Sequence, residues 1–114
     1  MPNYGARHIE TVEKILQAAK VPLRIMVDCS HGNSEKDPRK QADVLRDCMA
    51  QIENGNTSII GFMLESHLHA LNQPIQSNRE RMEYGVSVTD PCIDWETTES
   101  LLREVHQKMK EIVP

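Results

Sequence analysis

Three positions in this sequence carry side chains that can bind a divalent metal ion, and each comes shortly after an apolar run. These side chains are His31, Glu65 and Asp90. In α/β proteins the carboxyl ends of parallel strands face one common space, so donors that follow separate strands can meet there. One imidazole and two carboxylates suit manganese, iron(II) or zinc. Three protein donors that leave coordination positions open are typical of a catalytic metal site.

Each of the three donors also has an ordinary structural interpretation. His31 can be a loop histidine that hydrogen-bonds to the backbone, and Glu65 can be a solvent-facing residue at the end of a strand. Asp90 can begin a helix as an Asx residue before Pro91. The spacing therefore predicts a metal site and leaves these alternatives open.

The apolar pattern predicts the order helix, strand, helix, strand, long connection, helix. We expect helices over 5–19, from 37 to about 54 and over 96–112, strands over 23–28 and 58–64, and a brief third strand over 86–89. The repeated strand-then-helix order predicts a parallel sheet. The nearly continuous apolar run at 58–64 predicts a strand covered on both faces. The polar connection at 66–85 is long enough to be functional or flexible.

Composition limits the class of protein. The 114 residues fit one domain, and a net charge of −4 argues against binding to nucleic acid or to a membrane surface. The sequence contains neither an apolar stretch of bilayer-spanning length nor a secretory signal. Its three cysteines, Cys29, Cys48 and Cys92, are an odd number without CxxC spacing. A reducing, cytoplasmic location is therefore expected.

Several motifs resemble one enzyme family along nearly the whole chain. They are PNY at 2–4, MVDCSHGNSEKDPRKQ at 26–41, ESHL at 65–68 with NQ at 72–73, and YGVSVTDPCIDWETTESLLRE at 84–104. Together they resemble the C-terminal part of the class I 3-deoxy-D-arabino-heptulosonate 7-phosphate (DAHP) synthases, which are also called phospho-2-dehydro-3-deoxyheptonate aldolases. One departure is the pair Ala70-Leu71, where the family usually has an acidic residue followed by glycine.

The resemblance implies an α/β fold, the C-terminal part of a TIM (β/α)8 barrel. Residues 1–114 would form a single partial domain that carries helix 6, strand 7, helix 7, strand 8 and helix 8. The family condenses phosphoenolpyruvate with erythrose 4-phosphate, the first step of the shikimate pathway to aromatic amino acids. Its divalent metal is held by a cysteine of an early strand and by three residues that correspond to His31, Glu65 and Asp90.

Five neighbours of the expected ligands are candidates for a supporting role. Asp28, Ser30 and Asn33 are expected to orient His31, and Ser66 and His67 are expected to do the same for Glu65.

A complete barrel takes roughly 250 residues, so this sequence contains less than half of one. The family's early cysteine ligand and its phosphate-binding loops have no counterpart here. We therefore expect the isolated chain to be inactive, and to self-associate or to require the rest of the barrel, because an incomplete barrel exposes apolar surface and strand edges. The alternatives are a non-catalytic interaction module, which binds itself or a complete synthase, and a small independent metal-binding protein.

Overall fold

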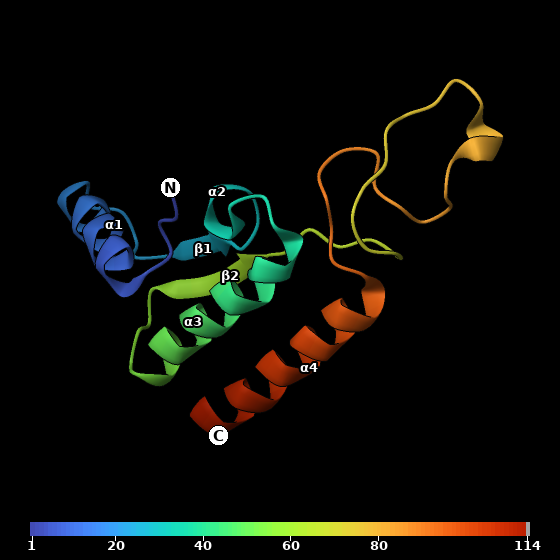
Figure 1. Cartoon of the computed structure of the whole chain (residues 1–114). Helices are drawn as coiled ribbons and strands as arrows, with labels where there is room; N and C mark the ends of the chain where they lie inside the picture. Colours follow the sequence, from blue (N-terminus) through green and yellow to red (C-terminus); the bar gives the residue numbers. More distant parts are fainter. Residues whose placement is uncertain (114) are drawn as a thin grey trace.

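The computed structural model describes residues 1–113 as an α/β arrangement of short strands and amphipathic helices (Figure 1). The elements in chain order are α1 (Ala6–Ala18), β1 (Ile25–Asp28), α2 (His31–Ser34), the 3-10 turn η1 (Pro38–Lys40), α3 (Gln41–Glu53), β2 (Ile59–Met63), the 3-10 turn η2 (Arg79–Arg81) and α4 (Trp95–Ile112). The three long helices and the first two strands lie within two residues of the predicted bounds, apart from the start of α3. The short α2 and η2 were not predicted, and η1 lies within the helix that was expected from residue 37.

The sheet consists of β1 and β2, which pair in parallel. Ile25 lies opposite Ile59, and a register irregularity after Ile25 brings Val27 opposite Phe62. The chain crosses from one strand to the other through α2, η1 and α3, so both strands end on the same side. The predicted parallel pairing is confirmed, and it places the residues after Asp28 and after Met63 next to each other.

One face of this sheet packs against the helices and forms the core. The buried apolar side chains of this core come from all three long helices, both strands and the segments that follow the strands: Ile9, Val27, Cys29, Val44, Leu45, Cys48, Ile59, Ile93 and Leu101. On the strands, Met26 and Ile60 are 66% and 62% exposed. The expectation that β2 is covered on both faces is therefore wrong for the described chain, because Ile60 alternates to a face that these helices do not cover.

The expected helix from residue 37 begins in two steps. Asp37 accepts a hydrogen bond from the amide of Arg39, and the intervening Pro38 starts the tight turn η1. The α-helical hydrogen-bond pattern of α3 then begins at Gln41. Proline at a first helical position suits this start because its missing N–H would have no partner there.

The expected strand at 86–89 is wrong. Ser87 forms an isolated bridge with Asn72, and neighbouring polar groups of this segment are satisfied by side chains. The Gln73 amide donates to the carbonyl of Val86, and the Asn72 amide donates to the carbonyl of Thr89. These side-chain bonds replace the backbone ladder of a strand. The surrounding segment, drawn in yellow to orange, extends away from the sheet as an arm (Figure 1).

The C-terminal helix α4 has 18 residues and a defined start. The carboxylate of Asp94 accepts a hydrogen bond of 2.8 Å from the amide of Thr97, as expected of an N-cap residue. Leu101 is buried against the core, whereas Leu102 on the next position is half exposed. Neither α4 nor any other helix in residues 1–113 is both long and apolar enough to cross a membrane.

Candidate metal centre

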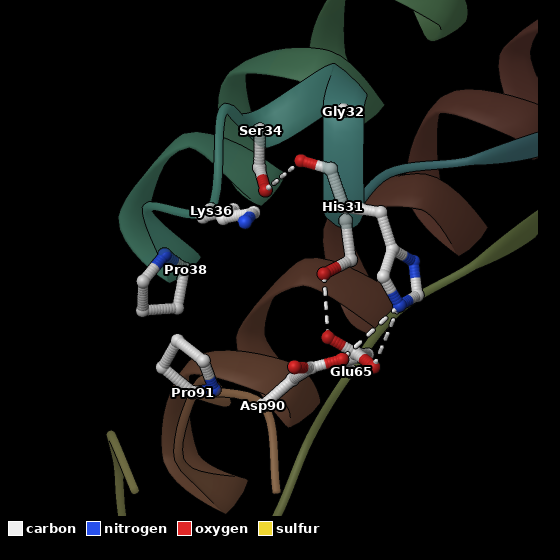
Figure 2. Close-up of a pocket in the computed structure, with 9 residues that line it drawn as sticks. His31, Gly32, Ser34, Lys36, Pro38, Glu65, Asp90 and Pro91 are labelled. Atoms are coloured by element: carbon white, nitrogen blue, oxygen red, sulfur yellow. Dashed lines mark hydrogen bonds and ion pairs between the residues drawn. The ribbon is translucent and has the colours of Figure 1, made fainter.

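The side chains of His31, Glu65 and Asp90 meet in one cluster beyond the ends of β1 and β2 (Figure 2). The Nε2 atom of His31 lies 3.3 Å from Oε1 of Glu65 and 3.3 Å from Oδ2 of Asp90. One donor atom from each residue lies within 4.8 Å of the other two. The structure therefore brings together the three predicted ligands, which are separated by 34 and 25 positions in the sequence.

The spacing of these donors fits a metal ion. Bonds from a metal to imidazole nitrogen or carboxylate oxygen are about 2.0–2.2 Å long, so two donors on one ion lie about 3.0–3.4 Å apart at octahedral or tetrahedral angles. The two distances of 3.3 Å fall in this range. They are longer than the usual N–H···O hydrogen bond of about 2.7–3.2 Å. The set of one nitrogen and two carboxylates also suits a divalent cation.

Asp28 contacts the imidazole of His31 on the side opposite the other two donors. The Nδ1 atom of His31 lies 2.9 Å from Oδ2 of Asp28, so the ring can donate Nδ1–H to the carboxylate and direct its Nε2 lone pair toward Glu65 and Asp90. The hydrogen bond to Asp28 and the negative charges of Glu65 and Asp28 raise the pKa of His31. A carboxylate behind a ligating imidazole is common at metal sites, because it fixes the tautomer and increases the basicity of the ring.

The turn between β1 and α2 holds Asp28 in this position. The amide of Ser30 donates to Oδ1 of Asp28, and the side-chain amide of Asn33 donates to the Asp28 carbonyl, both at 2.8 Å. His31 itself has φ 47°, a left-handed conformation that is uncommon for residues other than glycine. Such conformations persist where surrounding contacts over-determine them, often at functional sites.

Glu65 follows β2 and is held from several directions. The hydroxyl of Ser30 donates to Oε2 of Glu65 at 2.6 Å. The backbone of Glu65 pairs with the buried side-chain amide of Gln41. Its carbonyl also accepts a hydrogen bond from the amide of Ile93, which ties the end of β2 to the segment after Asp90. This hydrogen bond between Ile93 and Glu65, and not the expected third strand, places Asp90 near the other two donors.

Two of the predicted supporting residues lie elsewhere. The hydroxyl of Ser66 hydrogen-bonds with the hydroxyl of Thr98 in α4. The imidazole of the exposed His67 accepts the amide hydrogen of Leu68. Ser30 was expected to support His31, and its hydroxyl in fact contacts Glu65.

A cavity of about 160 Å³ opens beside the three donors (Figure 2). Lys36 and Ser34 line it together with the prolines at 38 and 91. The ammonium group of Lys36 adds positive charge to this wall, which suits an anionic ligand. Sequence reasoning missed both Lys36 and Gln41, because a surface-type residue in a loop or at the start of a helix carries no periodicity signal.

Parallel strands, a crossover helix and a His–Glu–Asp donor group at the strand ends define a segment of an α/β protein with a candidate metal centre. Residues 1–103 match the DAHP synthetase I family, and the chain belongs to this family. Members of the family are metal-dependent DAHP synthases. The resemblance noted from the motifs is therefore confirmed.

Individual relatives agree with this assignment. The chain is 50% identical over 112 residues to the Tyr-sensitive phospho-2-dehydro-3-deoxyheptonate aldolase of Enterobacter agglomerans, covering 98% of this chain and 53% of that protein. It is 51% identical over 108 residues to the Tyr-sensitive aldolase of Escherichia coli K12, covering 95% of this chain and 30% of that protein. The chain thus spans about half or less of the length of these relatives.

The fold agrees with a solved structure of the family. The phospho-2-dehydro-3-deoxyheptonate aldolase from Francisella tularensis matches with a TM-score of 0.88 and 40% identity, over 96% of this chain and 31% of that chain. The arrangement of helices and parallel strands described above therefore corresponds to part of a DAHP synthase chain.

Proposed function

We propose that this chain is the C-terminal part of a barrel that condenses phosphoenolpyruvate with erythrose 4-phosphate, and that it supplies three of the ligands of the divalent metal. The observation that carries the proposal is the convergence of His31, Glu65 and Asp90 at distances that suit one ion. The family membership supplies the reaction, in which DAHP and phosphate are formed.

The residues of this chain have separate tasks in the proposed site. A bound divalent metal would supply Lewis-acid polarisation of the aldehyde of erythrose 4-phosphate. Asp28 keeps His31 in the tautomer that presents Nε2, and Ser30 keeps the Glu65 carboxylate turned toward it. Lys36 lines the adjoining cavity, where its positive charge favours a phosphorylated substrate.

The remainder of the barrel is the proposed partner of this chain. Met26 and Ile60 expose their side chains on the sheet face opposite the helices, and apolar side chains on a two-stranded sheet favour a covering layer. Because the chain spans about 30% of the E. coli relative, we propose that it has no synthase activity alone. The same exposed face favours the second candidate function, an interaction module that binds itself or a complete synthase.

Calorimetric titration of the purified chain with Mn²⁺ tests the metal site. We expect binding by the parent and at least a tenfold loss in the H31A/E65A double variant. The H106A/E111A variant, which removes the same two residue types from exposed positions of α4, is the control and should bind like the parent. Equal binding by all three proteins would reject the site.

Two further measurements test the remaining parts of the proposal. The chain should release no phosphate from phosphoenolpyruvate in the presence of erythrose 4-phosphate, and measurable turnover would refute the proposed inactivity. Sedimentation at several concentrations, alone and with a complete E. coli synthase, separates the two candidate functions. Stable binding of the parent to the complete synthase that is lost in the I60K variant would favour the interaction module, whereas self-association alone is expected of either candidate.

A further inference from the structure

Gln41, the first residue of α3, has a side chain with no exposed surface although it carries a polar amide. Both ends of this amide bind the backbone of one residue, Glu65. Its Oε1 accepts the Glu65 N–H at 2.8 Å, and its Nε2 donates to the Glu65 carbonyl at 3.1 Å. Glutamine is mostly found at the protein surface, so a fully buried one with two partners on a single residue is a specific arrangement.

The chemistry of the amide explains why this position holds glutamine. A glutamine side chain offers a donor and an acceptor at one planar end, and a residue in extended backbone offers the complementary pair. The contact therefore continues hydrogen bonding past the last residue of β2, Met63, where strand pairing has ended. A leucine or methionine would fill the same space and leave two backbone groups of Glu65 with fewer partners.

We infer that Gln41 is a positioning residue, which fixes the backbone of Glu65 so that its carboxylate reaches the atoms of His31 and Asp90. This inference rests on the proposed metal site. The carboxylate has one supporting contact of its own, the hydroxyl of Ser30. That contact constrains one oxygen, whereas the amide of Gln41 constrains the chain from which the side chain extends. Both constraints together determine where Oε1 lies.

A general contribution to stability is the competing explanation, and the chain contains a matched control for it. Gln51 lies on the same helix, is partly buried, and donates its side-chain amide to the carbonyl of Tyr4 at 2.8 Å. Tyr4 and Gln51 lie outside the metal cluster. A substitution of Gln51 thus removes a comparable amide-to-backbone bond and leaves Glu65 untouched.

The experiment compares Mn²⁺ affinity of the full chain, measured by calorimetry, in the parent, Q41M and Q51M. We expect about a 10–100-fold loss for Q41M, the usual effect of removing a group that orients a metal ligand, and no change for Q51M. In the E65A background, Q41M should cause no further loss, because its effect passes through Glu65. Equal affinities of the parent and Q41M would overturn the inference, and so would the same loss in both backgrounds.

A second measurement keeps the inference separate from the metal site itself. Hydrogen exchange of the Glu65 amide, followed by NMR without metal, should be slow in the parent and at least tenfold faster in Q41M, with no change in Q51M. If the parent does not bind Mn²⁺, the proposed metal site fails, and unchanged exchange in Q41M would independently overturn the positioning role. If circular dichroism shows that Q41M is unfolded, Q41N, whose amide is one methylene shorter, is measured in its place with the same expectations.

Discussion

The Oδ2 atom of Asp28, the last residue of β1, lies 2.9 Å from the Nδ1 atom of His31, and the opposite nitrogen of the same ring faces Glu65 and Asp90. This contact connects the sheet to the candidate metal centre across a separation of three positions in the sequence. Asp28 is fixed by the strand on one side and by the amide of Ser30 on the other. The position of Asp28 at the end of β1 therefore determines the orientation of the His31 imidazole.

The first prediction concerns this carboxylate. In D28N the side-chain amide cannot accept Nδ1–H with the strength of a charged acceptor, so the ring loses both its fixed tautomer and part of its basicity. We expect about a 10–100-fold weaker affinity for Mn²⁺ by calorimetry at neutral pH. D43N removes the same charge from an exposed position in the first turn of α3 and should leave the affinity unchanged. A D28N variant that binds like D43N would show that Asp28 does not orient the ligand.

The sequence predicted the elements and the three converging donors because both depend on local patterns. Apolar periodicity marked α1, α3 and α4, and the position of each donor after an apolar run indicated the site. The arrival of Asp90 was predicted for the wrong reason. Asp90 does not follow a strand. Its position is set by the hydrogen bond between the Ile93 amide and the Glu65 carbonyl, which joins residues 28 positions apart and leaves no periodic signal in the sequence.

The supporting contacts were harder to predict than the ligands. A serine hydroxyl can reach any acceptor within its radius, so the sequence could not indicate that Ser30 contacts Glu65 or that Ser66 contacts Thr98. The sequence could not predict the role of Gln41 either, because the function of a buried amide depends on its hydrogen-bond partners in the fold and not on its neighbours in sequence. Tertiary packing determines the hydrogen-bond partners of these side chains.

The second prediction concerns Leu71, which has φ 73° and so lies in the left-handed region that favours glycine. A left-handed conformation costs a residue with a Cβ roughly 1–2 kcal/mol, whereas glycine adopts it freely and loses roughly 0.5–1 kcal/mol through backbone entropy. The Leu71 side chain is 57% exposed and contributes little burial. We expect L71G to be more stable than L71A by roughly 1 kcal/mol in urea unfolding. The reverse order would show that the turn is not strained.

The third prediction concerns the ion pair between α3 and α4. Nε and Nη2 of Arg46 each lie 3.0 Å from an oxygen of Glu104. The hydrogen bond and the charge of Arg46 lower the pKa of Glu104 in the folded chain. A lowered folded pKa contributes stability above the unfolded pKa of about 4.3, and this contribution is lost as the pH falls through the folded value.

R46M should therefore lower the free energy of unfolding at pH 7 by about 0.2–1 kcal/mol, the range of exposed ion pairs. The difference from the parent should shrink as the pH falls below the unfolded pKa of about 4.3 toward the lower folded pKa of Glu104, where the carboxylate becomes protonated. R103M breaks an ion pair between Glu99 and Arg103 within α4 and is the control, with a smaller expected effect. A difference for R46M that grows in acid would contradict the assigned sign.

The last prediction concerns Cys29 and Cys48, which have no exposed surface and lie in the core. Burial raises the pKa of Cys29 to about 12 and that of Cys48 to about 11. While the thiols are buried, on the order of one molecule in a thousand or fewer carries the reactive thiolate at either position at pH 8. In a C92A background both thiols should resist iodoacetamide until urea unfolds the chain. Rapid labelling of both in the absence of urea would show that the packing between α3 and the end of β1 opens readily in the isolated chain.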